Sequence, residues 1–479
     1  MKKLTLWLVF TSLSFYLLSA QTSLASFEPI AAKPKIAALQ SNTNAANILG
    51  ISYAFNGSLY WNALNDSGEV VEKKKLRLDG TRVRPRGTVY AANQFFHFYE
   101  NTDNHTMLVI EASDSGRESK LAKQQLLQKK ENFIAHLADK NEFYALALHR
   151  KSKTLRVFRF NPTTQTFDVK EILLKDYLVD KLHKVKFRPI AQVKNLMPHE
   201  AATPLKGYLL ATDKILLTID GAKARGQGPT ELLAIDWEAG TLENRIMGEN
   251  GFALDDHSKS FVFQDRIFRI IATKERLTLR AYNLNDLEKI QEFHYTPKTP
   301  IDIMDSPFHT ESSGNDGFYL FDPSRNAKDL EKDQAKKILK KLAVGAPFVL
   351  PESNGEGELL LTVGTHIATN GGGGMFMPGT PGTTISTPGG PVAMPGSPGM
   401  FVGGGGSYRL SRFFYTRLNA TNLSHLSTDD SEESGVNPIR QFIDETLTAK
   451  HVYALTPYGD KTAIVHYLRS DKRIKVDLF

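Results

Sequence analysis

Short runs of alternating hydrophobic and polar residues dominate the chain, and the clearest run spans residues 143–174. There FYALALH is followed by a Lys-rich turn, LRVFRFN alternates with a period of two, and PTTQT separates it from FDVKEIL. Successive side chains of a strand point to opposite faces, so this period predicts strands. The short polar breaks predict tight antiparallel hairpins rather than helical crossovers.

The same pattern of strands and turns recurs in four other stretches, at 95–116, 207–247, 260–295 and 451–479. A strand that ends in an apolar residue before Asn or Asp marks the repeat. The markers Asn161, Asp236 and Asn283 are 75 and 47 residues apart, with an insertion in the first gap. A unit of about 40–50 residues that holds three or four strands is typical of a propeller blade.

We therefore expect a mainly all-β, β-propeller-like fold with about six to eight blades and one or two short accessory helices. It would form a single domain over residues 48–479. A pair of β-sandwiches is the alternative, because sandwiches show similarly short strands.

Two segments have helical periodicity. Residues 326–347 place Ala335, Ile338, Leu339 and Leu342 on one face, and Gly345 and Pro347 follow as stop signals. We expect this helix to pack across the propeller rim; its Lys-rich opposite face leaves a membrane surface as the alternative. Residues 437–447 form a shorter candidate helix.

A segment without any charged residue interrupts the pattern at 371–406, where 14 of 36 residues are Gly and 6 are Pro. Strand-like sequences flank it, so we expect a long, disordered insertion between two strands of one sheet. It carries six large apolar residues, which a plain spacer would lack: Met375, Phe376, Met377, Met394, Met400 and Phe401. These residues suggest a loop that docks to a partner. The alternative is a low-complexity insertion without a function, which lies on the surface of its own propeller.

The N-terminus has the form of a secretory signal peptide. Lys2 and Lys3 precede an uncharged apolar run, and cleavage is plausible after Ala20 or after Ala25. We expect a signal peptide over 1–25, a disordered leader over 26–47, and an exported protein of the periplasm or cell surface. We expect no transmembrane segment after cleavage.

Composition narrows the class of protein. There is no Cys in 479 residues, which excludes disulfides and thiolate chemistry, and the net charge is a mild +7. The basic residues are scattered, so nucleic-acid binding is not expected.

No catalytic or metal-binding motif stands out, and we expect no metal site and no cofactor. The 13 His are spread singly, and the densest titratable cluster is Asp255, Asp256 and His257, where solvated turn residues are expected. The catalytic residues therefore remain unknown, although a pair of carboxylates on separate blades would leave no sequence signal.

One turn suggests a family likeness. The pattern Gly-x-Gly-Pro-x-Glu at residues 226–231 resembles a turn of exported, six-bladed-propeller-like bacterial proteins of unknown function. In those proteins a Gly often stands where this chain has Thr230. The Gly/Met/Pro-rich insertion followed by an aromatic strand also looks like this group. The resemblance implies a compartment and a fold, and no activity.

Together these features predict a non-catalytic binding or scaffold module of the bacterial cell envelope, with an unknown protein or polysaccharide as its partner. A carbohydrate-active hydrolase or lyase that uses carboxylates near the propeller channel is the alternative. Carboxylates and aromatic residues at the channel mouth would favour the enzyme, and small or aliphatic residues would favour the binding protein.

Overall fold

The structure is a computed structural model. It describes residues 22–29, 36, 38–76, 82–139, 141–183, 185–190, 201–211, 213–221, 229–247, 258–314, 329–353, 357–369, 375–377, 383–387, 390–394, 400–402, 408–426, 439, 442–443, 447, 452–468 and 470–479.

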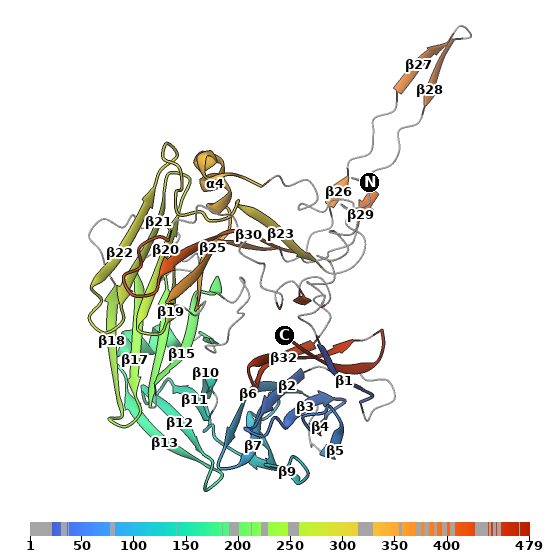
Figure 1. The fold of residues 1–479 in the computed structure, drawn as a ribbon, viewed down its shortest axis with the longest axis vertical. Helices are drawn as coiled ribbons and strands as arrows, with labels where there is room; N and C mark the ends of the chain where they lie inside the picture. Colours follow the sequence, from blue (N-terminus) through green and yellow to red (C-terminus); the bar gives the residue numbers. More distant parts are fainter. Residues whose placement is uncertain are drawn as a thin grey trace, which may run out of the picture.

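In the described part of the chain, seven sheets of four or five strands are arranged around a common centre (Figure 1), which confirms the predicted propeller-like, all-β fold. We number these blades in chain order. Blade 1 contains β2 (Ala38–Thr43), β3 (Leu49–Phe55), β4 (Ser58–Leu64) and β5 (Val70–Leu76). Blade 2 contains β6 (Val83–Ala91), β7 (Gln94–Asn101), β8 (Thr106–Ser113) and β9 (Ser119–Gln124). Blade 3 contains β10 (Glu131–Asp139), β11 (Glu142–His149), β12 (Thr154–Asn161) and β13 (Thr166–Leu173).

Blade 4 has an additional strand on its inner side. It contains β15 (Leu205–Ala211), β16 (Lys214–Asp220), β17 (Thr230–Asp236) and β18 (Thr241–Met247), and the short β14 (Arg188–Pro189) pairs in parallel with β15. Blade 5 contains β19 (Ser258–Phe263), β20 (Arg266–Ala272), β21 (Leu277–Asn283) and β22 (Lys289–Tyr295).

Blades 6 and 7 each take their outermost strand from an earlier part of the chain. Blade 6 has the order β24 (Ala346–Ser353), β25 (Glu358–Thr369), β30 (Tyr408–Asn419) and β23 (His309–Gly314). Blade 7 has the order β31 (Val452–Tyr458), β32 (Lys461–Leu468), β33 (Arg473–Leu478) and β1 (Thr22–Phe27). The pairing of β1 with β33 joins the two ends of the described chain and so closes blade 7.

Alternate connections of an antiparallel blade emerge on opposite sides. The first-to-second and third-to-fourth strand connections are short turns, and we call their side the hairpin face. The second-to-third strand connections emerge on the other side. We call that side the insertion face, because residues 370–407 connect β25 to β30 there.

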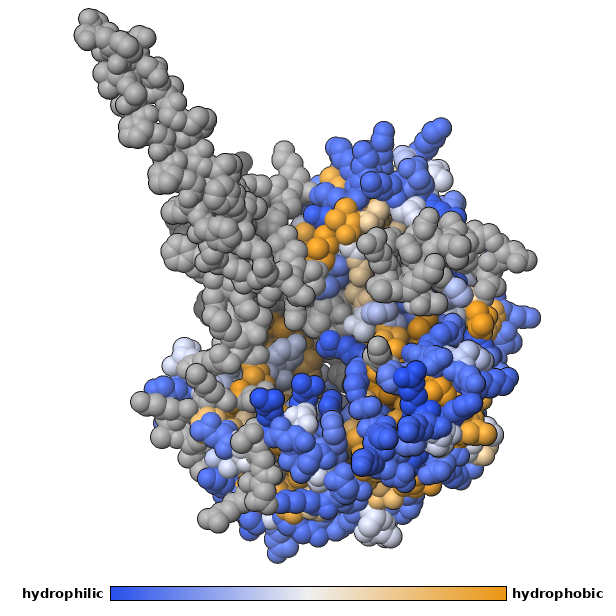
Figure 2. Space-filling view, turned by 180° about the vertical axis from the view of Figure 1, so that it is seen from behind, coloured by the Kyte–Doolittle hydropathy of each residue, from blue (hydrophilic) through white to orange (hydrophobic). Residues whose placement is uncertain are grey.

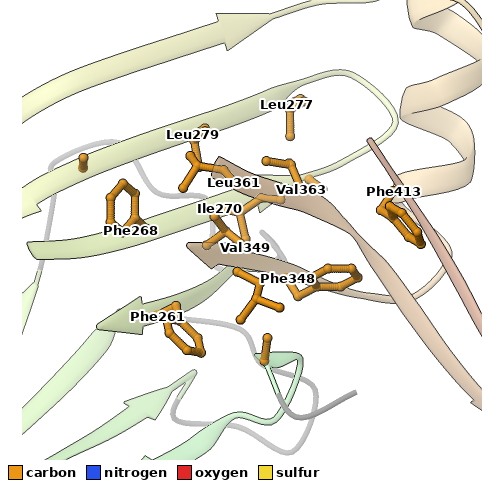
Figure 3. Close-up of a cluster of buried hydrophobic side chains, with 14 of the residues drawn as sticks. Phe261, Phe268, Ile270, Leu277, Leu279, Phe348, Val349, Leu361, Val363 and Phe413 are labelled. Atoms are coloured by element: carbon orange, nitrogen blue, oxygen red, sulfur yellow. The ribbon is translucent and has the colours of Figure 1, made fainter. Parts of the chain in front are cut away.

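The cores lie between neighbouring blades. Separate apolar clusters join blades 1 and 2, 2 and 3, 3 and 4, and 7 and 1, and a larger cluster joins blades 4, 5 and 6. Figure 3 shows part of the larger cluster, where Ile270 of blade 5 lies beside Val349 of blade 6. Since both faces of a blade are covered, the middle strands are buried along almost their whole length.

The marker that we used for the repeat is a recurring Asx turn at the end of third strands. The side-chain oxygens of Asn161, Asp236 and Asn283 each accept a backbone N–H two or three residues later. Asn419 makes the corresponding bond in blade 6. In blade 1, Asn65 follows the third strand and accepts the N–H of Glu69, four residues later. Asn and Asp are selected here because their short side chains satisfy the turn backbone.

The helix predicted over 326–347 is confirmed as η1 (Lys332–Gln334) and α4 (Ala335–Leu342). Its four predicted apolar residues are at most 1% exposed and join the core of blades 4 to 6, so the helix packs on the propeller. The helix α2 (Asp176–Leu182) was not predicted. Most of residues 437–447 lies outside the described residues. Among the described residues, no helix is long and apolar enough to cross a membrane.

Two segments that we expected to be disordered contain strands. The leader expected to be disordered over 26–47 contains the end of β1 and all of β2, because β1 completes blade 7 and β2 is the innermost strand of blade 1. The insertion at 371–406 does connect two strands of one sheet, as predicted. It also contains two short antiparallel ribbons, one of β26 (Met375–Met377) with β29 (Met400–Val402) and one of β27 (Thr383–Thr387) with β28 (Gly390–Met394). Figure 1 shows the second ribbon projecting away from the blades.

Candidate functional site: a polar cavity between blades 3 and 4

Blade 3 turns a row of polar side chains toward blade 4 near the hairpin face. Glu142 and Tyr144 are two residues apart on β11, so their side chains lie on the same side of the sheet. Arg159 on β12 lies opposite both Tyr144 and Asp168, a residue of β13, which places these side chains on that side too. Farther along the same side, Val157 belongs to the apolar core between blades 3 and 4. The row is therefore polar only where the strands reach the surface.

Arg159 is the centre of this row. Its Nη2 donates to Oε1 of Glu142 at 2.9 Å, and its Nη1 lies 2.6 Å from Oδ1 of Asp213 and 3.4 Å from Oε1 of Glu238. Asp213 and Glu238 belong to two turns of blade 4, and the Tyr144 hydroxyl also donates to Oδ1 of Asp213, at 3.3 Å. One guanidinium thus connects two blades.

A cavity of about 670 Å³ opens beside this cluster. Its volume lies within the range of small-molecule binding sites, about 300–1,000 Å³. The lining combines charged and amide side chains with a few apolar residues: Asp139, Asn141, Glu142, Arg159, Phe160, Asn161, Pro162, Asp168, Leu209 and Leu210. The turns of blade 3 and the inner strand of blade 4 form its walls.

The lining is acidic, because three carboxylates face one guanidinium. Burial raises the pKa of Glu142, and the charges of Asp213 and Asp139 add to the rise, while the charge of Arg159 opposes it. A ligand that donates hydrogen bonds, such as a polyhydroxyl compound, matches an excess of carboxylate oxygens. No group of three or more His, Asp or Glu side chains within the described part of the chain could hold a metal ion.

Blade 4 is held against blade 3 beside the cavity. The Nζ of Lys170 on β13 donates to the carbonyl oxygens of Trp237, at 2.5 Å, and Glu238, at 2.7 Å. The same ammonium lies 5.1 Å from the centre of the Trp237 ring. These contacts fix the turn that carries Glu238, one of the carboxylates near Arg159.

A Ser–His pair elsewhere is structural. Ser52 Oγ lies 2.7 Å from Nδ1 of His97 and 2.7 Å from the Tyr99 hydroxyl, and all three side chains are fully buried between blades 1 and 2. Burial lowers the pKa of His97 to about 3, so the imidazole is neutral. With no exposed surface, this pair has no access to a substrate.

The predicted docking residues all fall in the insertion. Met375, Phe376 and Met377 form β26, where Phe376 pairs with Phe401 and Met377 with Met400 of β29. Met394 ends β28. Their side chains lie outside what the structure describes, so their role stays a prediction.

The other residues that the sequence singled out contribute no site. Asp255, Asp256 and His257 lie outside the described residues. In the Gly-x-Gly-Pro-x-Glu pattern, Glu231 is the second residue of β17 and forms an ion pair with Lys181 of α2. It serves to attach a helix to blade 4.

No family model matches this chain, and no curated protein matches it. Among solved structures, the chain is similar to the WD40 domain of SCAP from fission yeast, at 9% identity and a TM-score of 0.35, with 92% of this chain and 81% of that chain covered. A streptogramin B lyase is similar at 8% identity and a TM-score of 0.35, with 96% and 97% covered.

The β-propeller domain of the trilobed protease from Pyrococcus furiosus is similar at 9% identity and a TM-score of 0.27, with 60% of this chain and 78% of that chain covered. The arrangement of the seven sheets makes this chain an all-β protein with a β-propeller fold.

Proposed function

We propose that this chain is an exported, non-catalytic binding module of the bacterial cell envelope, and that its cavity between blades 3 and 4 binds a saccharide. The lining of this cavity supports the proposal. Asp, Glu, Asn and Arg side chains bind hydroxyl groups directionally, and the neighbouring Leu209 and Leu210 offer apolar surface to a sugar ring.

The arrangement of the carboxylates favours binding over catalysis. Glu142 and Asp213 both lie within bonding distance of the Arg159 guanidinium, which holds them as acceptors. A glycosidase requires one carboxyl group that transfers a proton and a second that attacks or activates water. Two carboxylates bound to one cation are better suited to positioning a ligand than to moving a proton.

A glycan array probed with the labelled protein tests the proposal, followed by calorimetric titration of the best oligosaccharide. Asp168→Asn keeps the shape of the cavity lining but removes one charged acceptor, so binding is expected to weaken about tenfold or more. Asp180→Asn is the matched control, because Asp180 lies on α2, is 74% exposed and does not line the cavity. Equal affinities of the two variants, or no bound glycan, would contradict the proposal that this cavity binds a saccharide.

The second candidate is a carbohydrate-active hydrolase or lyase. The raised pKa of Glu142 is the observation that favours it, since a general acid must hold its proton near neutral pH. In this case Glu142→Gln would abolish the release of reducing ends from a bound oligosaccharide. Under the binding proposal no reducing ends are released by either protein.

The insertion is proposed as a second contact, with an envelope protein. Its ribbons project from the blades, and Met and Phe suit an irregular apolar surface. A pull-down from envelope extract with the intact protein, and with residues 371–406 replaced by a short Gly/Ser turn, tests this. A partner retained by both proteins would contradict the docking role.

A further inference from the structure

The innermost strands of blades 2 and 3 bring together several cations toward the insertion face. Arg84 and Arg86 lie on β6, the inner strand of blade 2. Lys186 lies two residues before β14, which pairs with the inner strand of blade 4. The backbone N–H of Phe187 donates to the carbonyl of Ile134 on β10, at 2.8 Å, so this segment is attached to blade 3 as well.

These cations share one carboxylate among the residues that the structure describes. Glu100 on β7 pairs in register with Arg84, forms an ion pair with Arg86, and lies 2.9 Å from Nδ1 of His105. Partial burial of its ammonium lowers the pKa of Lys186, and the charges of Arg86 and Arg84 lower it further against the attraction of Glu100. Three positive charges therefore lie close enough to repel one another.

A buried imidazole lies beside them. His136 on β10 is 7% exposed, and burial together with the charges of Arg86 and Lys186 holds its pKa well below the usual value. Its Nε2 has no hydrogen-bond partner within the described part of the chain, and neither has Nε of Arg86. Each is a shielded nitrogen that a bound ligand atom would satisfy.

We propose that Arg84, Arg86, Lys186 and His136 form a binding site for a doubly charged oxyanion of the phosphate type. Three cations against one carboxylate leave a formal charge of +2, which matches a phosphate monoester or inorganic phosphate. Arginine offers the planar, paired donors that bind phosphate oxygens. The negative charge of the anion would offset the repulsion among the three cations, which the fold holds close together.

The surroundings suit such a ligand. Arg84 and Lys186 are exposed, while Arg86 and His136 are progressively more buried. The donors therefore extend from the surface inward. Hydrophilic residues dominate the described surface in the view of Figure 2. The inner strands, which carry the proposed site, surround the centre of the ring. None of these four residues lines the proposed saccharide cavity.

Calorimetric titration of the purified protein with inorganic phosphate, at constant ionic strength set with chloride, tests the proposal. Removing one cation with Arg84→Gln is expected to weaken phosphate binding about tenfold, and Arg84→Gln with Lys186→Gln to abolish measurable binding. Lys274→Gln is the matched control, because Lys274 is exposed in the β20–β21 turn on the same face. Equal affinity in the wild type and Arg84→Gln, or no phosphate binding by the wild type, would overturn the site.

Two further measurements locate the anion and identify its source. The ring resonances of His136 are expected to shift on addition of phosphate in the wild type and to stay fixed in the double variant. A hexose 6-phosphate that binds more tightly than inorganic phosphate would indicate a phosphate carried on a sugar, and the reverse order would indicate the free ion. The side chain of Arg84 is exposed, so the unfolding midpoint of Arg84→Gln should equal that of the wild type and separate a binding defect from a folding defect.

Discussion

At the scale of single residues, Arg159 and Asp220 perform comparable tasks in different surroundings. Arg159 is 28% exposed and joins carboxylates of two blades beside a cavity. Asp220 is fully buried, and its Oδ2 lies 2.8 Å from Nζ of the equally buried Lys206. The first arrangement leaves room for a ligand. In the second, the N–H and the hydroxyl of Ser260 in blade 5 also donate to Asp220, so the carboxylate holds blades 4 and 5 together.

Replacement of Arg159 by Gln leaves Glu142 and Asp213 without their common cation. We expect the variant to lose about 1–2 kcal/mol of unfolding free energy, less than a fully buried pair because the groups retain contact with water. Adding Glu142→Gln should restore part of the loss, since it removes one uncompensated charge. Urea unfolding of the two single variants and the double variant measures the coupling, and strictly additive losses would contradict it.

Asp220 gives the structure a predictable response to acid. Burial alone would raise its pKa, but the charges of Lys206 and Lys259 and the hydrogen bonds of the carboxylate outweigh burial and leave the pKa below its usual 3.8. The ion pair therefore contributes its stability above pH 3.8 and loses it as the pH falls through the lower pKa of the folded state.

We expect Asp220→Asn to cost about 3–5 kcal/mol at neutral pH and to reduce the loss of stability in acid. Unfolding free energies on both sides of pH 3.8 measure both effects. Asp265→Asn is the control, since Asp265 is 67% exposed. If Asp220→Asn does not fold, Thr230→Val removes a single 2.9 Å hydrogen bond to the same carboxylate and should show a smaller loss. An acid response that is unchanged in both variants would contradict the role of Asp220.

At the scale of elements, local patterns in the sequence were sufficient to predict the strands, the turns and one helix. The markers Asn161, Asp236 and Asn283 end the third strands of consecutive blades, because the Asx turn is a local interaction. The helix around Ile338 could be predicted because its period reflects a single buried face.

Interactions between distant elements could not be predicted in this way. The outer strands β1 and β23 join blades whose other strands come much later in the chain, so no neighbouring sequence reveals their pairing. The cavity was missed for the same reason. The alternation on β11 and β12 predicts that Glu142 and Arg159 lie on the same face of blade 3. It does not predict that Asp213 of blade 4 contacts Arg159.

The strand β1 favours one of the two cleavage sites proposed for the signal peptide. Thr22 pairs with Leu478 and Phe27 with Ile474, so cleavage after Ala25 would remove most of the strand that completes blade 7. We predict cleavage after Ala20, which leaves β1 whole. Mass spectrometry of the N-terminal peptide of the exported protein should find Gln21 first, and a protein beginning at Ser26 would contradict this.

At the scale of the whole molecule, the propeller is a ring of blades whose two faces carry different connections. The hairpin face has short turns and the acidic cavity, and the insertion face has the long segment and the cationic cluster. A rigid ring with separate sites on its two faces suits a protein that holds ligands together.

The insertion should contribute little to folding. β25 and β30 pair over twelve residues each, and the cost of closing a loop grows only slowly with its length. Replacing residues 371–406 by a short Gly/Ser turn is expected to change the unfolding free energy by less than about 1 kcal/mol. Urea unfolding measures this, and loss of the cooperative transition would show that the insertion is part of the fold.

We propose above all that the protein binds a saccharide and leaves it intact. The most direct test incubates the protein with the oligosaccharide selected on the array, separates the complex by gel filtration, and measures the mass of the recovered glycan. The account predicts that the glycan travels with the wild type, is recovered at its starting mass, and is lost from Asp168→Asn. Fragments of lower mass would establish the enzyme, and a glycan that never travels with the protein would contradict the binding module.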